Sequence, residues 1–206
     1  MKISRRFTAV LGAAAAIALP VASQAQVTYY TTGSFGSGTS VTFGSGANTA
    51  TINFSCMFRA DYSNCTSADQ TTVTPPPGSY TTGARYGVFT SSVTGTGANG
   101  SSPFTLNIFQ TAPGMGNGSV YSTISGTVTS SGNSILFTTS PTSVGINGVT
   151  YSVNQNLNFI PSTCSDNSQG CGSLTIQGAV TTPEPSSMAL LGTGLVGLVP
   201  MFRRKK

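Results

Sequence analysis

The sequence has 206 residues, a formal net charge of +5 at pH 7 and no histidine. Seven of its nine lysines and arginines lie among the first six and the last four residues, so residues 26–182 carry only two cations and three anions. This excludes nucleic-acid binding, which needs many cations to neutralise phosphates. The absence of histidine excludes Ser–His and Cys–His catalysis and imidazole metal ligands. We expect no enzyme activity, no metal site and no cofactor.

The first predicted element is a secretory signal peptide at residues 1–25. Three cations within the first six residues precede an apolar run over residues 9–19, and a small-residue pattern ends at Ala25. As a helix, this run of 11 residues would span about 16 Å, well short of a hydrocarbon core of roughly 30 Å. We therefore expect export through the inner membrane and cleavage after Ala25. The pattern leaves the choice between general secretory and twin-arginine export open.

The exported region, residues 26–182, is predicted to be a single all-β domain. It contains four leucines, and glycine or proline interrupts every window that could form a helix. Apolar and polar residues alternate with period two, which indicates strands, in FTLNIFQ (104–110), VYSTISGTV (120–128), VTYSV (149–153) and SLTIQGAV (173–180). Gly–Asn and Asn–Gly pairs between such segments suit tight hairpins. About nine or ten short strands favour a jelly-roll-like β-sandwich, with an up-and-down barrel as the alternative.

Four cysteines in this region predict two local disulfides, Cys56–Cys65 and Cys164–Cys171. Export places the thiols in an oxidising compartment, and four cysteines allow three pairings. The local pairing is favoured because each pair closes a short loop of turn-forming residues. The spacing contains no Cys-x-x-Cys motif and argues against a metal site. Each bond should stabilise the fold by about 2–3 kcal/mol.

The segment from Cys56 to about residue 84 interrupts the strand pattern, and a specific ligand site would be expected there first. Its Pro75–Gly78 run cannot lie inside a sheet, and the segment is longer than most connections. The simpler interpretation is a surface insertion held by its disulfide. If it binds a ligand, the residues flanking it that could hydrogen-bond to or stack on a sugar are Arg59, Asp61, Tyr62, Tyr80, Arg85 and Tyr86.

The last predicted element spans residues 183–206. Pro183, Glu184 and Pro185 keep the backbone extended, a form that a protease cleft can bind by strand-like pairing. Residues 187–202 carry no charge and predict a short transmembrane helix. Four cations follow and should stay in the cytoplasm, namely Arg203, Arg204, Lys205 and Lys206.

These three parts, in this order, resemble the PEP-CTERM sorting signal of Gram-negative bacteria. The resemblance covers about the last 24 residues. In that family an exosortase, a membrane-embedded cysteine transpeptidase, recognises the tail and cuts it near the Pro-Glu-Pro. The resemblance implies that the precursor is held transiently in the inner membrane, with the exosortase as a transient partner. It also implies delivery to the cell surface or the extracellular matrix, where such proteins often accompany exopolysaccharide and biofilm production.

Together these features predict an exported, non-catalytic protein of the cell surface or of the exopolysaccharide matrix. A nearly uncharged surface rich in Ser, Thr and Gly gives little mutual repulsion and favours association. The alternative is a lectin-like carbohydrate-binding module. Seven tyrosines, all in the exported region, could supply its aromatic contacts.

Overall fold

The computed structural model describes residues 26–36, 38–56, 63–74, 81–129, 132–155, 157–158 and 169–183. All of them belong to one compact unit that spans Ala25–Pro183. The predicted signal peptide at residues 1–25 and the predicted transmembrane helix at residues 187–202 lie outside these described residues. Within the described ranges, no helix is long and apolar enough to cross a membrane.

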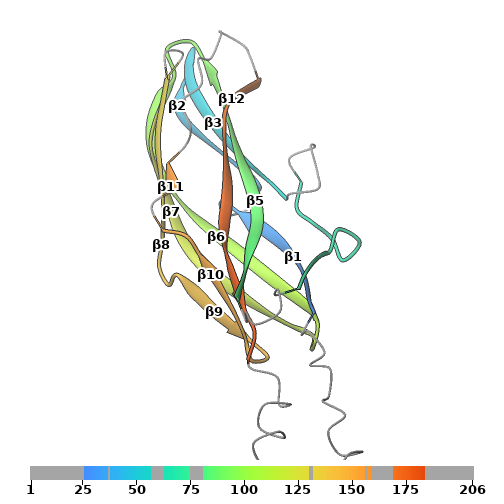
Figure 1. Ribbon diagram of the computed structural model, residues 1–206. Helices are drawn as coiled ribbons and strands as arrows, with labels where there is room; N and C mark the ends of the chain where they lie inside the picture. The colour runs from blue at the N-terminus through green and yellow to red at the C-terminus, as the bar shows by residue number, and fades with distance from the viewer. Residues whose placement is uncertain are drawn as a thin grey trace, which may run out of the picture. The chain divides into compact units, whose positions relative to one another are not determined.

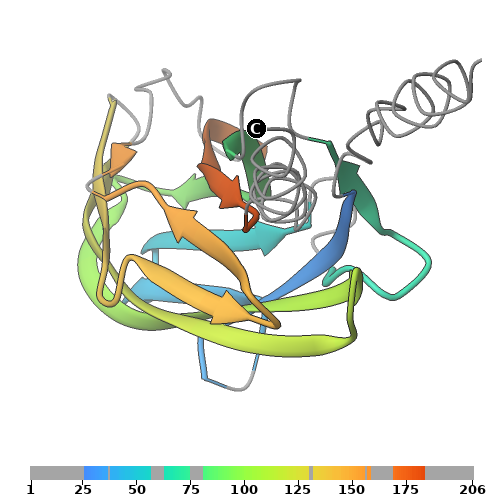
Figure 2. The ribbon, with the colours of Figure 1, turned by 60° about the horizontal axis from the view of Figure 1, so that its bottom comes forward.

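Two six-stranded antiparallel sheets make up the described domain (Figure 1). The strands are β1 (Val27–Ser34), β2 (Ser40–Ser45), β3 (Asn48–Ser55), β4 (Thr71–Val73), β5 (Thr81–Thr94), β6 (Ala98–Ala112), β7 (Gly116–Thr129), β8 (Gly132–Thr139), β9 (Ser143–Ile146), β10 (Val149–Val153), β11 (Leu157–Asn158) and β12 (Gln169–Thr181). Sheet A has the order β11-β8-β7-β6-β1-β4, and sheet B has the order β2-β3-β5-β12-β10-β9. The two sheets curl over one another (Figure 2), which confirms the predicted all-β sandwich.

The strands differ from the prediction in number and in length. Twelve are present in the described part of the chain instead of nine or ten, and β5, β6, β7 and β12 have 13 to 15 residues each. The segment FTLNIFQ, for example, forms only the second half of β6. Gly100, in the first half of β6, continues the strand and pairs with Gly126 of β7. Its missing Cβ leaves room for the ring of Phe43, and this contact helps to close the sandwich where β2 packs on β6.

Period-two alternation places one face of each sheet in a shared core. β1 alternates strictly between buried and partly exposed residues, and Ile52, Leu106 and Ile176 are fully buried between the sheets. Four phenylalanines from both sheets meet at ring-centroid distances of 4.8–6.1 Å, mostly in tilted or edge-to-face geometry. These aromatic pairs add stabilisation beyond their buried area. They are Phe54, Phe89, Phe104 and Phe137.

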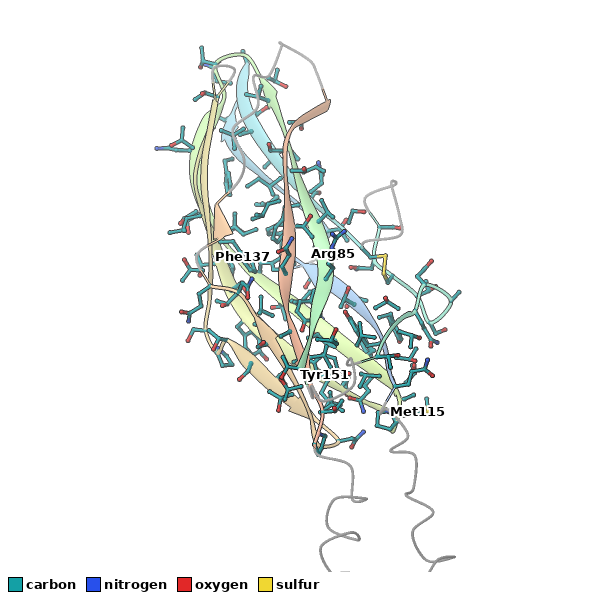
Figure 3. All side chains as sticks on the ribbon, viewed as in Figure 1. Arg85, Met115, Phe137 and Tyr151 are labelled. Atoms are coloured by element: carbon teal, nitrogen blue, oxygen red, sulfur yellow. A yellow bond between two sulfur atoms is a disulfide. The ribbon has the colours of Figure 1, made fainter. Side chains whose placement is uncertain are left out.

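A second core cluster consists of three tyrosines, Tyr29, Tyr86 and Tyr151, all at most 1% exposed. The ring of Tyr29 lies 5.8 Å from that of Tyr86 and 5.5 Å from that of Tyr151. Each hydroxyl donates a hydrogen bond: Tyr29 to the Arg85 carbonyl, Tyr86 to the Ala179 carbonyl and Tyr151 to Oε1 of buried Gln110. Figure 3 marks Tyr151 and Phe137, one from each aromatic cluster.

Burial of these phenols disfavours their charged form. It raises the pKa of Tyr29 to about 12. Burial, together with the neighbouring tyrosines, raises the pKa values of Tyr86 and Tyr151 well above the ordinary tyrosine value. Because of this cluster, the free energy of unfolding of the domain should fall at alkaline pH.

Candidate functional site

The described residues contain no group of three or more His, Cys, Asp or Glu side chains that could hold a metal ion. Asp69, the single Asp or Glu among the described residues, has a structural role. Its Oδ2 accepts hydrogen bonds from the backbone N–H and from the hydroxyl of Thr66, both at 2.8 Å. This bonding closes the turn that leads to β4 and explains why an aspartate lies there.

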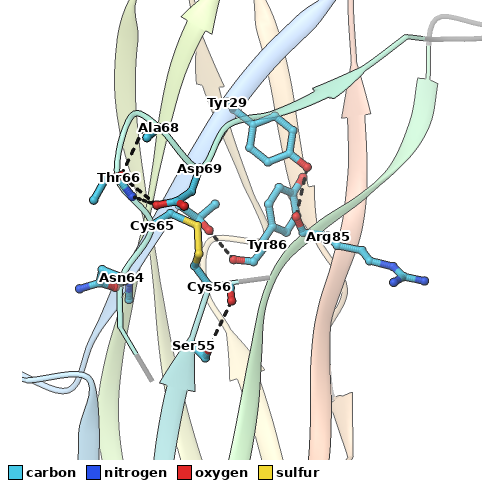
Figure 4. Close-up of a disulfide and its surroundings, with 12 residues drawn as sticks. Tyr29, Ser55, Cys56, Asn64, Cys65, Thr66, Ala68, Asp69, Arg85 and Tyr86 are labelled. Carbon is cyan, nitrogen blue, oxygen red and sulfur yellow. Dashed lines mark hydrogen bonds between the residues drawn. A yellow bond between two sulfur atoms is a disulfide. The ribbon is translucent and has the colours of Figure 1, made fainter. Parts of the chain in front are cut away.

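The predicted Cys56–Cys65 disulfide is present, with the two Cα atoms 5.3 Å apart (Figure 4). It joins the end of β3 to the segment before β4. That segment is also bonded to β1, because Oδ1 of Asn64 accepts from the Gly33 N–H at 2.6 Å and the Cys65 N–H donates to the Thr31 carbonyl at 3.3 Å. The disulfide and these two hydrogen bonds therefore attach this part of the insertion to β3 and β1 of the sandwich. The second predicted pair cannot be placed: Cys164 and the side chain of Cys171 lie outside what is described.

Of the six residues predicted to contact a ligand, the structure describes only two. Four of them fall outside the described residues, namely Arg59, Asp61, Tyr62 and Tyr80. The remaining two, Arg85 and Tyr86, are neighbours on β5 and point to opposite sides of sheet B. Tyr86 is 0% exposed and lies in the core, so the prediction that it contacts a ligand is wrong. Its aromatic ring packs against Tyr29 instead of facing solvent.

Arg85 lies exposed on the outer face of sheet B (Figure 3). It lines a shallow hollow of about 340 Å³. Two amide side chains, those of Asn154 and Gln177, share the lining with it. Gly178 forms part of the floor, and a Cβ there would collide with the Ser152 carbonyl. Arg85 is the one charged residue in the twelve described strands. The hollow therefore offers a guanidinium and two amides, groups that hydrogen-bond to carboxylates and hydroxyls.

Two tyrosines among the described residues, Tyr30 and Tyr121, lie elsewhere, on the outer face of sheet A. Tyr30 on β1 stacks on Phe109 of β6, with the rings 4.8 Å apart and 7° from parallel. Tyr121 on β7 is 60% exposed. Sequence reasoning did not single out these residues. The signal was available in the alternation itself, since Tyr121 follows Val120, one of the positions expected to face the core.

The carboxyl end of the domain runs directly into the predicted sorting signal. Thr181, the last residue of β12, pairs with Thr81 on β5 and with Thr150 on β10. Thr182 is only 4% exposed. Pro183 is exposed and lies close to Gly148 of the β9–β10 turn. The folded domain thus extends to the first residue of the Pro-Glu-Pro, while Glu184, Pro185 and the basic residues Arg203, Arg204, Lys205 and Lys206 lie outside the described ranges.

Residues 181–206 match the family model described as the PEP-CTERM protein-sorting motif. The chain carries a PEP-CTERM sorting signal. No curated protein and no solved structure matches the chain. The PEP-CTERM match confirms the resemblance noted in the sequence and indicates a protein that is exported and then anchored or processed at the membrane. It also implies an exosortase as the processing partner. The match begins at Thr181, so the PEP-CTERM signal overlaps the last residue of β12.

Proposed function

We propose that this protein is a non-catalytic component of the cell surface or of the exopolysaccharide matrix, delivered there through its PEP-CTERM signal. The observation that supports this most directly is the surface chemistry of the domain. Among the residues of the twelve described strands, only Arg85 is charged. The outer faces instead present hydroxyl and amide groups, for example the hydrogen-bonded pair Thr42 and Thr51 and the pair Thr81 and Thr181. Such a surface has little charge repulsion against copies of itself or against an uncharged matrix.

The described residues include no pair of catalytic carboxylates, which supports the same proposal. Glycoside hydrolysis requires two placed carboxylates, and in the described part of the chain Asp69 is committed to its turn. The disulfide and the long paired strands suit a durable scaffold outside the cell.

Two measurements test the proposal. Culture fractionation should recover the protein from the cell surface or the matrix, and mass spectrometry should give a carboxyl terminus near Pro183 without the four basic residues. A protein that remains in the inner membrane with Lys206 intact would contradict the sorting step. Deletion of the gene should reduce biofilm or floc formation. A deletion strain with unchanged matrix and unchanged aggregation would contradict the matrix role.

A second candidate function is that of a lectin-like carbohydrate-binding module. The observation that favours it is the placement of Tyr30 and Tyr121 on one uncharged sheet face, while three other tyrosines are buried. Aromatic rings offer an apolar surface on which the C–H face of a sugar can pack. A pull-down with purified polysaccharides separates this function from a purely structural role.

A further inference from the structure

The outer face of sheet A combines exposed aromatic rings with strands that carry no charged residue. None of the strands of this sheet contains Asp, Glu, Lys or Arg. Tyr30, Phe109 and Tyr121 all lie on the outer side, because each sits between two buried neighbours on its strand. Met115, at 84% exposure, is also a large exposed apolar side chain, but it lies in the β6–β7 turn rather than on the face.

The strand register sets the distance between the aromatic positions. Tyr121 pairs with Thr105 of β6, and Thr105 is four residues from Phe109 along the same strand. At roughly 3.4 Å per residue, the two ring positions are about 14 Å apart along the sheet. A single sugar could not contact both positions, whereas a chain of several sugars could. Phe109 and Tyr30 are direct partners in the register, so they act as one aromatic position.

A row of polar side chains crosses the face midway between these two positions. Asn107 of β6 pairs with Thr32 of β1 on one side and with Ser119 of β7 on the other. The Ser119 hydroxyl donates to Asn107 Oδ1 at 2.7 Å, and Asn107 Nδ2 donates to the Thr32 hydroxyl at 3.4 Å. These bonds fix the orientation of the amide, which keeps a second N–H for a further acceptor.

We propose that this face binds a chain of an uncharged polysaccharide. The C–H faces of its sugars pack on the ring pair of Tyr30 and Phe109 and on Tyr121, and its hydroxyls bond to Asn107 and its neighbours in the row. The charge pattern determines the ligand class. An acidic polymer needs cations, and none of the residues in the strands of sheet A is one. The inference rests on the second candidate function and gives it a site and a ligand.

The test is a binding assay with the protein as cells produce it. Insoluble cellulose and cross-linked dextran serve as uncharged probes, and alginate on beads serves as the acidic probe, all at physiological salt. The protein should be retained on at least one uncharged probe and not on alginate. Tyr121→Ala should weaken that retention about tenfold, as expected when one aromatic contact is lost. Tyr121→Phe, which keeps the ring, and Met115→Ala, which removes an exposed apolar side chain elsewhere, should bind like the wild type.

Several results would overturn the proposal. These are retention on alginate alone, retention on none of the three probes, and equal binding by Tyr121→Ala and the wild type. Concentration-dependent self-association that Tyr121→Ala abolishes would show instead that a second copy of the chain covers the face. Circular dichroism of Tyr121→Ala checks that it folds, and Asn107→Ala, expected to weaken the same binding, provides an independent variant. Failure of binding leaves the sorting proposal intact, because that proposal is tested separately by culture fractionation and by the mass of the carboxyl terminus.

Discussion

The buried tyrosine cluster predicts that the domain loses stability steeply in alkali. Tyr29, Tyr86 and Tyr151 ionise near pH 10 in the unfolded chain, but burial raises their pKa values in the folded domain, that of Tyr29 to about 12. Above pH 10 the folded state therefore binds more protons than the unfolded state. The free energy of unfolding is then at its full value below pH 10 and falls as the pH rises toward the folded pKa values.

The size of this effect follows from proton linkage. Each tyrosine that ionises only in the unfolded state lowers the free energy of unfolding by about 1.4 kcal/mol per pH unit. Three such groups give a slope on the order of 4 kcal/mol per pH unit above pH 10. A domain with a typical stability of about 5–15 kcal/mol should therefore unfold within a few pH units of that point.

Substitution of one buried tyrosine distinguishes the loss of stability caused by tyrosine ionisation from a loss that is the same at every pH. At neutral pH, Tyr29→Phe loses the hydrogen bond to the Arg85 carbonyl and should be less stable by about 1 kcal/mol. Above pH 10 its slope should be about a third smaller, so the stability curves of the variant and the wild type should converge and cross. Urea titrations followed by circular dichroism between pH 8 and pH 12 measure both quantities.

Met115→Ala is the control, since it removes an exposed side chain that has no ionisable group. It should leave the alkaline slope unchanged. The reasoning would be refuted by a wild-type stability that stays flat from pH 10 to pH 11.5, or by a Tyr29→Phe variant with the full wild-type slope.

Three further predictions concern the disulfide, a strand contact and the sorting junction. Replacing Cys56 and Cys65 together by alanine should lower the free energy of unfolding by about 2–3 kcal/mol in urea titrations, because the bond restricts the unfolded chain. Gly178→Ala should lower it by about 1–3 kcal/mol, because the new Cβ collides with the Ser152 carbonyl. Inserting a short Gly/Ser spacer between residues 182 and 183 should speed carboxy-terminal processing severalfold in a pulse-chase experiment, because the paired end of β12 currently limits the extended strip that an exosortase can bind.

Each of the three has its own control. For the disulfide, a double variant as stable as the wild type would show that the bond does not restrain the unfolded chain. For the strand contact, Gly83→Ala is matched, since its Cβ would meet nothing within 4 Å and the variant should be as stable as the wild type or slightly more so. Equal losses in both glycine variants would exclude the collision as the cause. For the junction, a spacer of the same length placed after residue 74 should leave processing unchanged, and an equal rate in all three proteins would reject the steric argument.

Much of this protein is determined by local properties of its sequence. Segments in which Thr, Val, Tyr and Phe alternate with period two, separated by glycine-rich turns, indicate strands. Because residues 26–182 carry almost no charge, the surface of the domain has to consist mainly of uncharged polar residues. The PEP-CTERM signal is a short linear pattern and is recognisable without any fold. The Cys56–Cys65 bond was also predictable, because a local pair needs only a short loop to close.

The tertiary structure decided where each strand ends and which aromatic residues face solvent. Adjacent tyrosines Tyr29 and Tyr30 look equivalent in sequence, yet one lies in the core and the other on the surface. A register irregularity between Ile176 and Gln177 lies opposite the part of β5 where Tyr86 and Gly87 are both buried, so simple alternation is lost there. The physical reason is that a one-residue shift moves a side chain to the opposite face of a sheet. Register depends on partners that are distant in sequence, and only the assembled sheets specify it.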